Sequence, residues 1–345
     1  MLSLFFHAWE RRLAAASKDR VVRPFEWGVD WLPSTFDHHG DPPDSRVRAY
    51  VDSVLADPHA WFTGPPTDDY TLGAAASDGT RALRFPSVLH TRHPENNLVT
   101  ARLFPSVARG GARRAVVVLP QWNSDAEGHV GLCRLLARFG MTALRLSLPY
   151  HEARMPPELS RADYIVSSNI VRTLEVCRQA VLDARRAIQW LARQGFERIG
   201  VLGTSLGSCL SMLTACHEPL VNAQALNHIS PYFGDVVWRG LSTLHVRSGL
   251  DGHVTLEQLR DVWRPISPQA HLDTLRTRDV RSLLVYARYD LTFPVDLSKN
   301  LIAEFRKRGI PHQVSVLPCG HYSTGVTPFK YMDGILLTRF LDRAL

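Results

Sequence analysis

The sequence contains few lysines, few cysteines and no long apolar run. Only four of its 40 basic residues are lysines, so its net charge of +7 is an excess of arginine. These arginines are scattered rather than clustered with aromatic residues, which argues against a nucleic-acid-binding protein. Because no run of about 18 apolar residues occurs, a membrane-spanning helix is excluded.

The five cysteines are widely spaced and include no CxxC pair. We therefore expect reduced thiols in the core rather than a disulfide framework or a zinc site. At the N terminus, Glu10, Arg11 and Arg12 interrupt a short apolar patch before a signal-peptide core can form. These features favour the cytoplasm over secretion, and they leave open a helix at the N terminus that lies on a membrane surface.

The length of 345 residues, with 45% apolar and 21% charged residues, is typical of a soluble protein with one catalytic-size domain and some additions. Residues 1–70 contain no chemical motif and predict two helices, near 2–16 and 44–56. We interpret them as an N-terminal helical extension that precedes a domain over residues 71–345.

Residues 82–106 form two extended runs around the turn signal PENN, which predicts an antiparallel hairpin. Strands and helices then alternate. The predicted strands are 115–120, 141–149, 198–203, 223–230, 282–290 and 312–318, and the predicted helices are 129–140, 170–191 with one buried stripe, 205–216, 295–309 and 331–345. This alternation predicts an α/β fold with a mostly parallel sheet and helices on both faces. Residues 231–279 interrupt it with short helical pieces, which we expect to form a small cap above the carboxyl edge of the sheet.

The stretch VLGTSLGSCL places Ser205 between Gly203 and Gly207, after an apolar strand and before a helix. A G-x-S-x-G corner of this kind holds its serine in a strained conformation. The turns on either side pass so close that only glycine fits two residues away. We therefore predict that Ser205 is a nucleophile.

A serine hydroxyl needs a histidine base, and the histidine needs a carboxylate that fixes its tautomer. Asp290 in YARYD and His321 in GHYSTG each follow a predicted strand, in the order serine, acid, histidine. The carboxyl ends of parallel strands are where sites are built in such sheets. Asp235 and Asp251 are rival acids, but they precede the last two strands and are typical of helix caps.

A tetrahedral intermediate needs two N–H donors for its oxyanion. The first expected donor is the backbone N–H of Leu206, at the start of a helix. The second must come from the loop after strand 115–120, where Trp122 is the better candidate and Gln121 the reserve. The sequence has Pro120-Gln121 where a His-Gly pair is common, and Trp122 could instead be a pocket-wall aromatic.

Other polar residues also follow predicted strands. The candidates for substrate binding are Gln121, Tyr150 and His151, while His129 and His228 could line the pocket without acting as the base. Arg154 could bind an anionic group of the substrate, although a structural salt bridge near the pocket rim is the favoured interpretation. No metal site is predicted.

GTSLG, YARYD and GHYSTG, in this order, resemble the α/β-hydrolase superfamily, and the resemblance covers about residues 82–345. The segment LPYHEAR and the preceding hairpin are more similar to the dienelactone-hydrolase, acetyl-esterase and abhydrolase-domain-containing 18 branches than to the common lipases. The resemblance implies an α/β-hydrolase fold with an eight-stranded, mostly parallel sheet, serine hydrolase activity and no cofactor. Ser205, Asp290 and His321 match the triad positions.

The expected function is hydrolysis of a small-molecule or lipid-like carboxylic ester through an acyl-enzyme. Peptidases on this fold commonly carry a large N-terminal propeller, for which the preceding residues are too few, and a dehalogenase would have aspartate at position 205. The alternatives are an acyltransferase, a peptidase or a non-catalytic ligand-binding protein of the same fold. Activity should rise with pH through a single limb near 6 to 7. The sequence does not indicate an oligomeric state.

Overall fold

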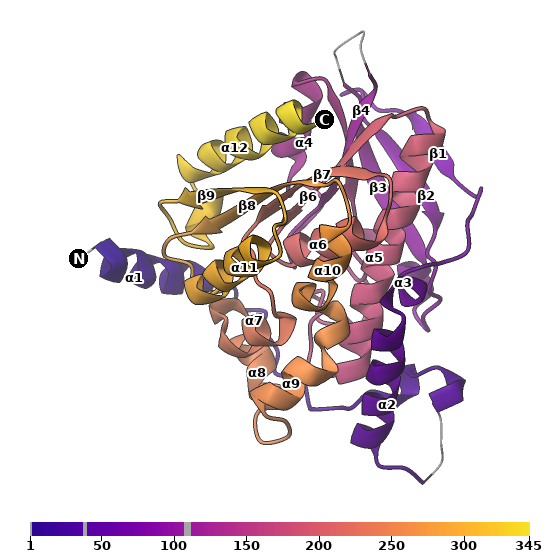
Figure 1. Cartoon of the computed structure of the whole chain (residues 1–345), viewed down its shortest axis with the longest axis vertical. Helices are drawn as coiled ribbons and strands as arrows, with labels where there is room; N and C mark the ends of the chain where they lie inside the picture. Colours follow the sequence, from indigo (N-terminus) through magenta and orange to yellow (C-terminus); the bar gives the residue numbers. More distant parts are fainter. Residues whose placement is uncertain (1, 37–39, 107–111) are drawn as a thin grey trace.

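The computed structural model describes residues 2–36, 40–106 and 112–345. Its strands are β1 (Thr71–Ala75), β2 (Arg81–Pro86), β3 (Leu98–Phe104), β4 (Arg114–Leu119), β5 (Met141–Leu146), β6 (Arg198–Thr204), β7 (Val221–Asn227), β8 (Arg281–Ala287) and β9 (His312–Leu317). They form one sheet in the order β1-β2-β3-β5-β4-β6-β7-β8-β9 (Figure 1).

The sheet is mostly parallel, as predicted. Strands β4 to β9 pair in parallel, whereas β1, β2 and β3 make antiparallel pairs at one edge. The predicted hairpin is β2 and β3. The sheet has nine strands rather than eight, because the segment before the hairpin adds β1.

The helices are α1 (Leu2–Ala14), α2 (Pro43–Ala56), α3 (Pro58–Trp61), α4 (Val130–Arg138), α5 (Ile170–Arg193), α6 (Leu206–His217), α7 (Phe233–Arg239), α8 (Leu244–Leu250), α9 (Leu256–Val262), α10 (Leu272–Arg276), α11 (Val295–Lys307) and α12 (Phe329–Ala344). The helices predicted in the N-terminal extension are α1 and α2. In the described ranges, none of these helices has the length and apolar character needed to cross a membrane.

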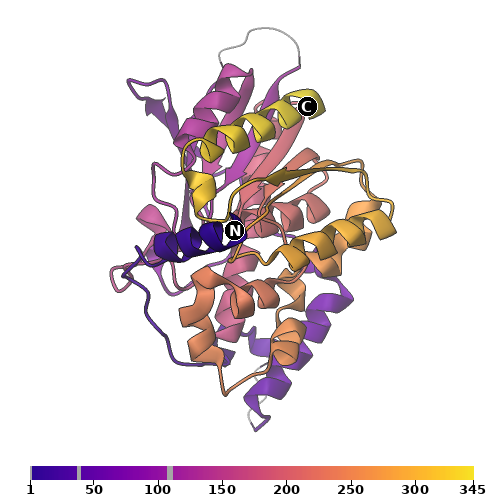
Figure 2. The same cartoon turned by 90° about the vertical axis from the view of Figure 1, so that its left-hand side faces the viewer.

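Helices cover both faces of the sheet (Figures 1 and 2), and an apolar core lies under each layer. Along β4, Val117 and Leu119 join the core beneath α5, α6 and α11, and Val116 and Val118 join the core beneath α4 and α12. Successive side chains of a strand point to opposite faces, so an unbroken apolar run becomes buried on both. The five cysteines are also buried and unpaired.

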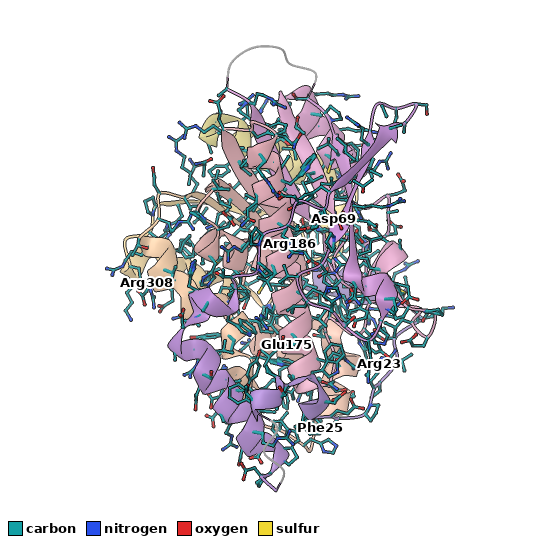
Figure 3. The ribbon with its side chains drawn as sticks, turned by 90° about the vertical axis from the view of Figure 1, so that its right-hand side faces the viewer. Arg23, Phe25, Asp69, Glu175, Arg186 and Arg308 are labelled. Atoms are coloured by element: carbon teal, nitrogen blue, oxygen red, sulfur yellow. The ribbon has the colours of Figure 1, made fainter. Side chains whose placement is uncertain are left out.

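Helix α5 is buried on nearly all sides, not along one stripe as predicted. The segment that carries α2 and α3 covers its outer face, where Glu175 accepts a hydrogen bond from Tyr50 and Arg186 donates to the carbonyl of Pro65 (Figure 3). These polar side chains are therefore partnered within the protein. The division of the chain at residue 70 stays a prediction.

The segment of residues 231–279 contains α7 to α10 and lies between β7 and β8 in the chain. It follows the carboxyl end of β7, and its role as a cap stays a prediction. Tyr232, Phe233 and Pro268 from this segment line a cavity together with Ser205. The insertion therefore contributes to the wall above the sheet edge.

Candidate active site

Ser205 occupies the sharp corner between β6 and α6. Its backbone has φ 58° and ψ −120°, a conformation that is strained for any residue with a side chain. A Cβ on Gly203 would lie 2.1 Å from the carbonyl oxygen of Gly207, and one on Gly207 would lie 2.0 Å from that of Leu119. Both glycines are thus required by the close backbone approach that the sequence pattern predicts.

Backbone strain is concentrated at the carboxyl edge of the parallel strands. In the described part of the chain, the non-glycine residues with positive φ are Asn123, His129, Tyr150, Glu152, Ser205 and His228. All of them lie in the loops after β4, β5, β6 and β7. Such strain persists only where the surroundings hold it in place, and it often marks functional sites.

Asp290 follows β8 and is buried, with four hydrogen-bond donors around its carboxylate. Oδ1 accepts from the backbone N–H groups of Thr292 and Phe293 at 2.8 and 2.7 Å. Oδ2 accepts from Nδ1 of His321 at 3.1 Å and from Nδ1 of His228 at 2.7 Å. Burial would raise the pKa of Asp290, but the two imidazoles outweigh it and hold the pKa below its ordinary value.

His228 is the unexpected member of this cluster. It follows β7, is almost fully buried, and its ring centroid lies 4.2 Å from that of His321. Burial, followed by the neighbouring His321, lowers the pKa of His228, so the ring stays neutral near neutral pH. The sequence placed His228 after a strand, but it gave no sign that its partner would be the acid predicted for His321.

The three groups also have ligand atoms within 4.8 Å of one another, a spacing at which a metal ion can be held. In this structure each histidine uses its Nδ1 to donate to the shared carboxylate oxygen. The observed arrangement is thus one of two imidazoles hydrogen-bonded to one carboxylate oxygen.

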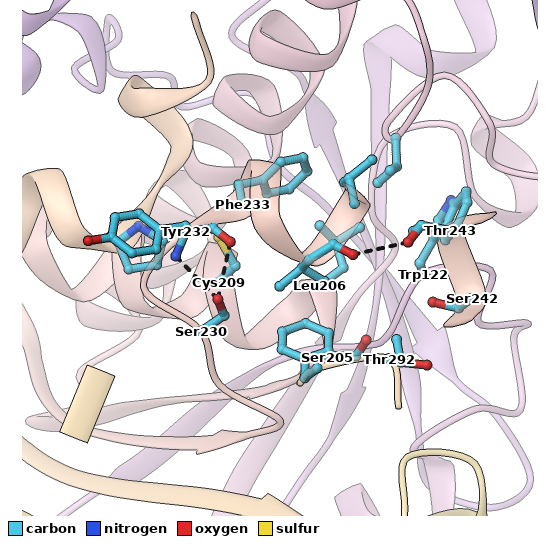
Figure 4. A pocket seen from close by; sticks show the side chains of 15 residues that line it. Trp122, Ser205, Leu206, Cys209, Ser230, Tyr232, Phe233, Ser242, Thr243 and Thr292 are labelled. Atoms are coloured by element: carbon cyan, nitrogen blue, oxygen red, sulfur yellow. Dashed lines mark hydrogen bonds between the residues drawn. The ribbon is translucent and has the colours of Figure 1, made fainter. Parts of the chain in front are cut away.

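A cavity lies beside Ser205 (Figure 4), with about 480 Å³ of empty space that includes its opening to solvent. It is lined by Trp122, Val166, Ser205, Leu206, Cys209, Ser230, Tyr232, Phe233, Val236, Val237, Ser242, Thr243, Pro268, Thr292 and Phe293. None of these described residues is charged. The ring of Phe293 also stacks on His321, with centroids 5.5 Å apart, so the cavity wall extends to the histidine.

The Ser205 hydroxyl makes no hydrogen bond to any residue in the described ranges. Of the predicted triad, Asp290 and His321 are hydrogen-bonded to each other. Ser205 is bonded to neither of them. It lies at the same edge of the sheet, and it lines the cavity together with Phe293, which stacks on His321. In uncomplexed enzymes, the contact between nucleophile and base is often loose and tightens with substrate.

The loop after β4 places Trp122 on the cavity wall. Its indole Nε1 donates to the carbonyl of Ala162 at 2.8 Å, and its ring stacks on His245 with centroids 5.7 Å apart. Leu206 is the first residue of α6, where backbone N–H groups have no acceptor within the helix. Both residues thus line the cavity beside Ser205, whereas Gln121 does not. Their oxyanion roles stay predictions.

Tyr150 and His151 are buried, and neither lines the cavity. The Tyr150 hydroxyl bonds Nδ1 of His93 at 2.9 Å. His151 Nδ1 donates to the carbonyl of Pro149, and its Nε2 accepts from the N–H of Asn123 at 2.9 Å. Burial lowers the pKa of His151 to about 4, so a neutral ring supports the loop that carries Trp122. Substrate binding by Gln121, Tyr150 and His151 stays a prediction.

The remaining candidates have partners inside the protein. Arg154 is fully buried and pairs with Asp183 at 2.8 Å, so the salt bridge expected near the pocket rim lies in the interior. His129 Nε2 bonds the hydroxyl of Thr204 at 3.0 Å. Of the rival acids, Asp235 pairs with Arg260, and Asp251 follows α8 at the surface.

No family model and no curated protein matches this chain. Among solved structures, the acetyl xylan esterase from Paenibacillus sp. R4 is similar with a TM-score of 0.62 and 14% identity, over 92% of this chain and 98% of that one. Acetyl xylan esterase 1 from Thermoanaerobacterium sp. JW/SL YS485 is similar with a TM-score of 0.59 and 16% identity, over 97% of this chain and 98% of that one.

The acylaminoacyl peptidase from Pyrococcus horikoshii is similar over 77% of this chain, with a TM-score of 0.61 and 16% identity. This chain spans only 42% of the length of that peptidase. Together, these matches show that the chain has the α/β-hydrolase fold, as the resemblance in its motifs implied. At these identities they show the fold alone.

Proposed function

We propose that this protein is a serine hydrolase that cleaves a carboxylic ester through an acyl-enzyme, with Ser205, His321 and Asp290 as its triad. The observation that carries the proposal is the bond between His321 Nδ1 and a buried, ionised Asp290, formed at the same sheet edge as the strained Ser205. An acid that fixes an imidazole at the sheet edge that also carries the serine corner is consistent with the arrangement that acyl transfer requires.

In this mechanism, Ser205 Oγ attacks the ester carbonyl while His321 Nε2 takes the hydroxyl proton. Asp290 keeps the Nδ1 proton on the far side of the ring and stabilises the imidazolium that forms. The backbone N–H groups of Leu206 and Trp122 hold the oxyanion. His321 then protonates the leaving alcohol, and the same base activates the water that hydrolyses the acyl-enzyme.

The cavity supports an uncharged acyl group. Phe233, Val236 and Val237 supply an apolar wall, and no charged side chain stands among the described lining residues. Burying an ionised substrate group there would cost several kcal/mol without a partner. A small-molecule or lipid-like ester therefore suits the site, and the two acetyl xylan esterases with this fold are consistent with ester chemistry.

Acyl transfer to an alcohol other than water uses the same three residues, so it is the closest alternative. Peptide cleavage is a further alternative on this fold, and the similar peptidase is matched over 42% of its own length. A non-catalytic ligand-binding protein would not need a strained serine and an oriented imidazole at the same edge of the sheet. Product analysis with and without added alcohols distinguishes hydrolysis from acyl transfer.

Labelling with a fluorophosphonate probe tests the proposal. The wild-type protein should become covalently labelled at Ser205, and S205A should not. S242A removes another hydroxyl from the same cavity wall and should keep the label. Folded wild-type protein that stays unlabelled would favour a ligand-binding protein over an enzyme.

The acyl preference can be measured with aryl esters of increasing acyl chain length. We expect kcat/KM to rise while added methylene groups still enter the apolar cavity, by up to about fourfold for each group, and to fall once the chain exceeds it. A profile that does not depend on chain length would place the acyl group outside the cavity.

A further inference from the structure

The N-terminal helix α1 lies against the loop that carries His321. Figure 2 shows α1, in indigo, below α12 and level with α11. Its residue Glu10 has an exposed fraction of 0%, although it lies in the extension outside the motif-bearing part of the chain. Burying a carboxylate is costly unless it is well hydrogen-bonded, so the partners of Glu10 explain its position.

Those partners all belong to the loop that carries His321. Oε2 of Glu10 accepts from the backbone N–H of Tyr322 at 2.8 Å. Oε1 accepts from the N–H of Ser323 at 2.9 Å and from its hydroxyl at 2.7 Å. The same hydroxyl accepts from the N–H of Gly320 at 2.8 Å. One carboxylate thus fixes the backbone on both sides of the histidine.

Gly320 is part of the same fit. A Cβ at this position would lie 2.3 Å from Cδ of Glu10, closer than any side chain allows. Because Gly320 has no side chain, the loop can pack directly against the carboxylate of Glu10. This gives a physical reason for a residue that the sequence showed only as the neighbour of a histidine.

Further contacts join α1 to the loop that carries the acid. The ring of Phe6 stacks on Tyr289, the residue before Asp290, with centroids 4.5 Å apart and an interplanar angle of 7°. Beyond the helix, Arg20 donates to the hydroxyl of Tyr322 at 3.0 Å. Helix α1 also packs against the short helix Leu241–Thr243, part of which lines the cavity.

We propose that Glu10 is a positioning residue for His321, and that the N-terminal helix is for this reason an integral part of the active site. The inference rests on the proposed function. A carboxylate suits the role because both of its oxygens only accept, matching the N–H groups of Tyr322 and Ser323. A glutamine would direct an NH2 group at one of those N–H groups, and the loop would have to move.

The experiment measures inactivation of the full-length protein by the fluorophosphonate probe, separating the rate constant kinact from the binding constant KI. E10Q should lower kinact by about 10- to 100-fold, because a shift of the base by about 1 Å is enough for such a loss. KI should change by less than about twofold, since Glu10 does not line the cavity. A residue with a purely structural role would not separate the two constants.

E175Q is the matched control. Glu175 is also a nearly buried carboxylate that accepts a hydrogen bond, but its partner Tyr50 lies on α2, on the outer side of α5. Its kinact should stay within about twofold of wild type. S323A removes one of the three bonds to Glu10, together with the acceptor of the Gly320 N–H. It should lower kinact by about threefold to tenfold, and its effect should be smaller in the E10Q background.

The outcomes are distinct. A labelled wild-type protein with a slow E10Q and a normal E175Q supports the proposal. If E10Q reacts at the wild-type rate, the proposal is wrong while the proposed function stands. If E10Q does not fold, S323A decides, and an unchanged kinact overturns the proposal. A wild-type protein that never labels at Ser205 overturns the proposed function and this inference with it.

Discussion

Two regions of the molecule each contain a buried carboxylate, and the two carboxylates have different hydrogen-bond partners. Asp183 lies in the middle of α5, where Oδ2 accepts from Arg154 at 2.8 Å and Oδ1 from the hydroxyl of Ser87 at 2.7 Å. Both members of this ion pair have side chains that are 0% exposed. Asp290 lies at the carboxyl edge of the sheet, and its side-chain partners are two imidazoles instead of an arginine.

The partners decide what each carboxylate can do. Burial raises the pKa of Asp183 in spite of the adjacent Arg154, whose charge is permanent. The two imidazoles lower the pKa of Asp290, so it stays ionised beside groups that can gain a proton. We propose that the first carboxylate stabilises the fold and that the second stabilises a charge that appears during a reaction.

The largest expected effect is on activity at the sheet edge. D290N should lower kcat for ester hydrolysis by about 10³- to 10⁴-fold, because its NH2 group would oppose the Nδ1 proton of His321 and favour the wrong tautomer. The circular dichroism spectrum should stay that of wild type. A D290N protein with nearly full activity would contradict the role of this carboxylate.

In the interior, the same change should act on stability instead. D183N leaves the buried charge of Arg154 without a counter-charge, so we expect the free energy of unfolding to fall by about 3 to 5 kcal/mol. The value of kcat, corrected for the folded fraction, should change by less than about twofold. Urea unfolding and active-site titration measure both quantities. A loss of kcat without a loss of stability would remove the distinction between the two regions.

Buried neutral histidines allow a comparison with both carboxylates. His217 Nε2 bonds Nδ1 of His271 at 3.0 Å, and burial lowers their pKa values to about 2 and about 4. As the pH falls, these imidazoles are therefore protonated in the unfolded chain first, near pH 6.5, while they stay neutral in the folded protein. Stability should be complete above that pH and fall below it, by up to about 1.4 kcal/mol per pH unit for each histidine, down to the folded pKa. Urea unfolding between pH 7.5 and 4.5 tests this, and a flat profile would contradict it.

The smallest expected effect concerns His228. H228L removes one donor from Asp290 and should strengthen the attraction between that carboxylate and a protonated His321. The pH limb of activity should then move upward, by up to about one unit. H228N tolerates the positive φ and keeps an N–H donor, so its limb should stay closer to that of wild type. If activity rises over the same pH range in wild type, H228L and H228N, His228 does not influence the site.

Local patterns were enough to predict where the parallel strands end. Ser205, Asp290 and His321 each follow a strand, and the glycines around Ser205 report a close approach within a few residues. The mostly parallel sheet follows for the same reason, since each strand and helix has its own periodicity.

The contacts that complete the site are long-range and left no local pattern. His228 bonds a residue 62 positions away, and Glu10 bonds one 312 positions away. An isolated glutamate in a helix is usually a solvated residue, and only the folded chain shows that this one is buried. Similarly, the sequence of α5 predicts one buried stripe, but the helix is almost fully buried because the N-terminal segment packs against its outer face.

The most direct test of the triad is to look for the acyl-enzyme itself. The protein is mixed with an aryl ester, quenched with acid during turnover, digested and analysed by mass spectrometry. We predict an acyl adduct on the peptide that contains Ser205, formed at a rate at least equal to kcat and absent from S205A. Ester turnover with no adduct on Ser205, or with the adduct on another residue, would contradict the account.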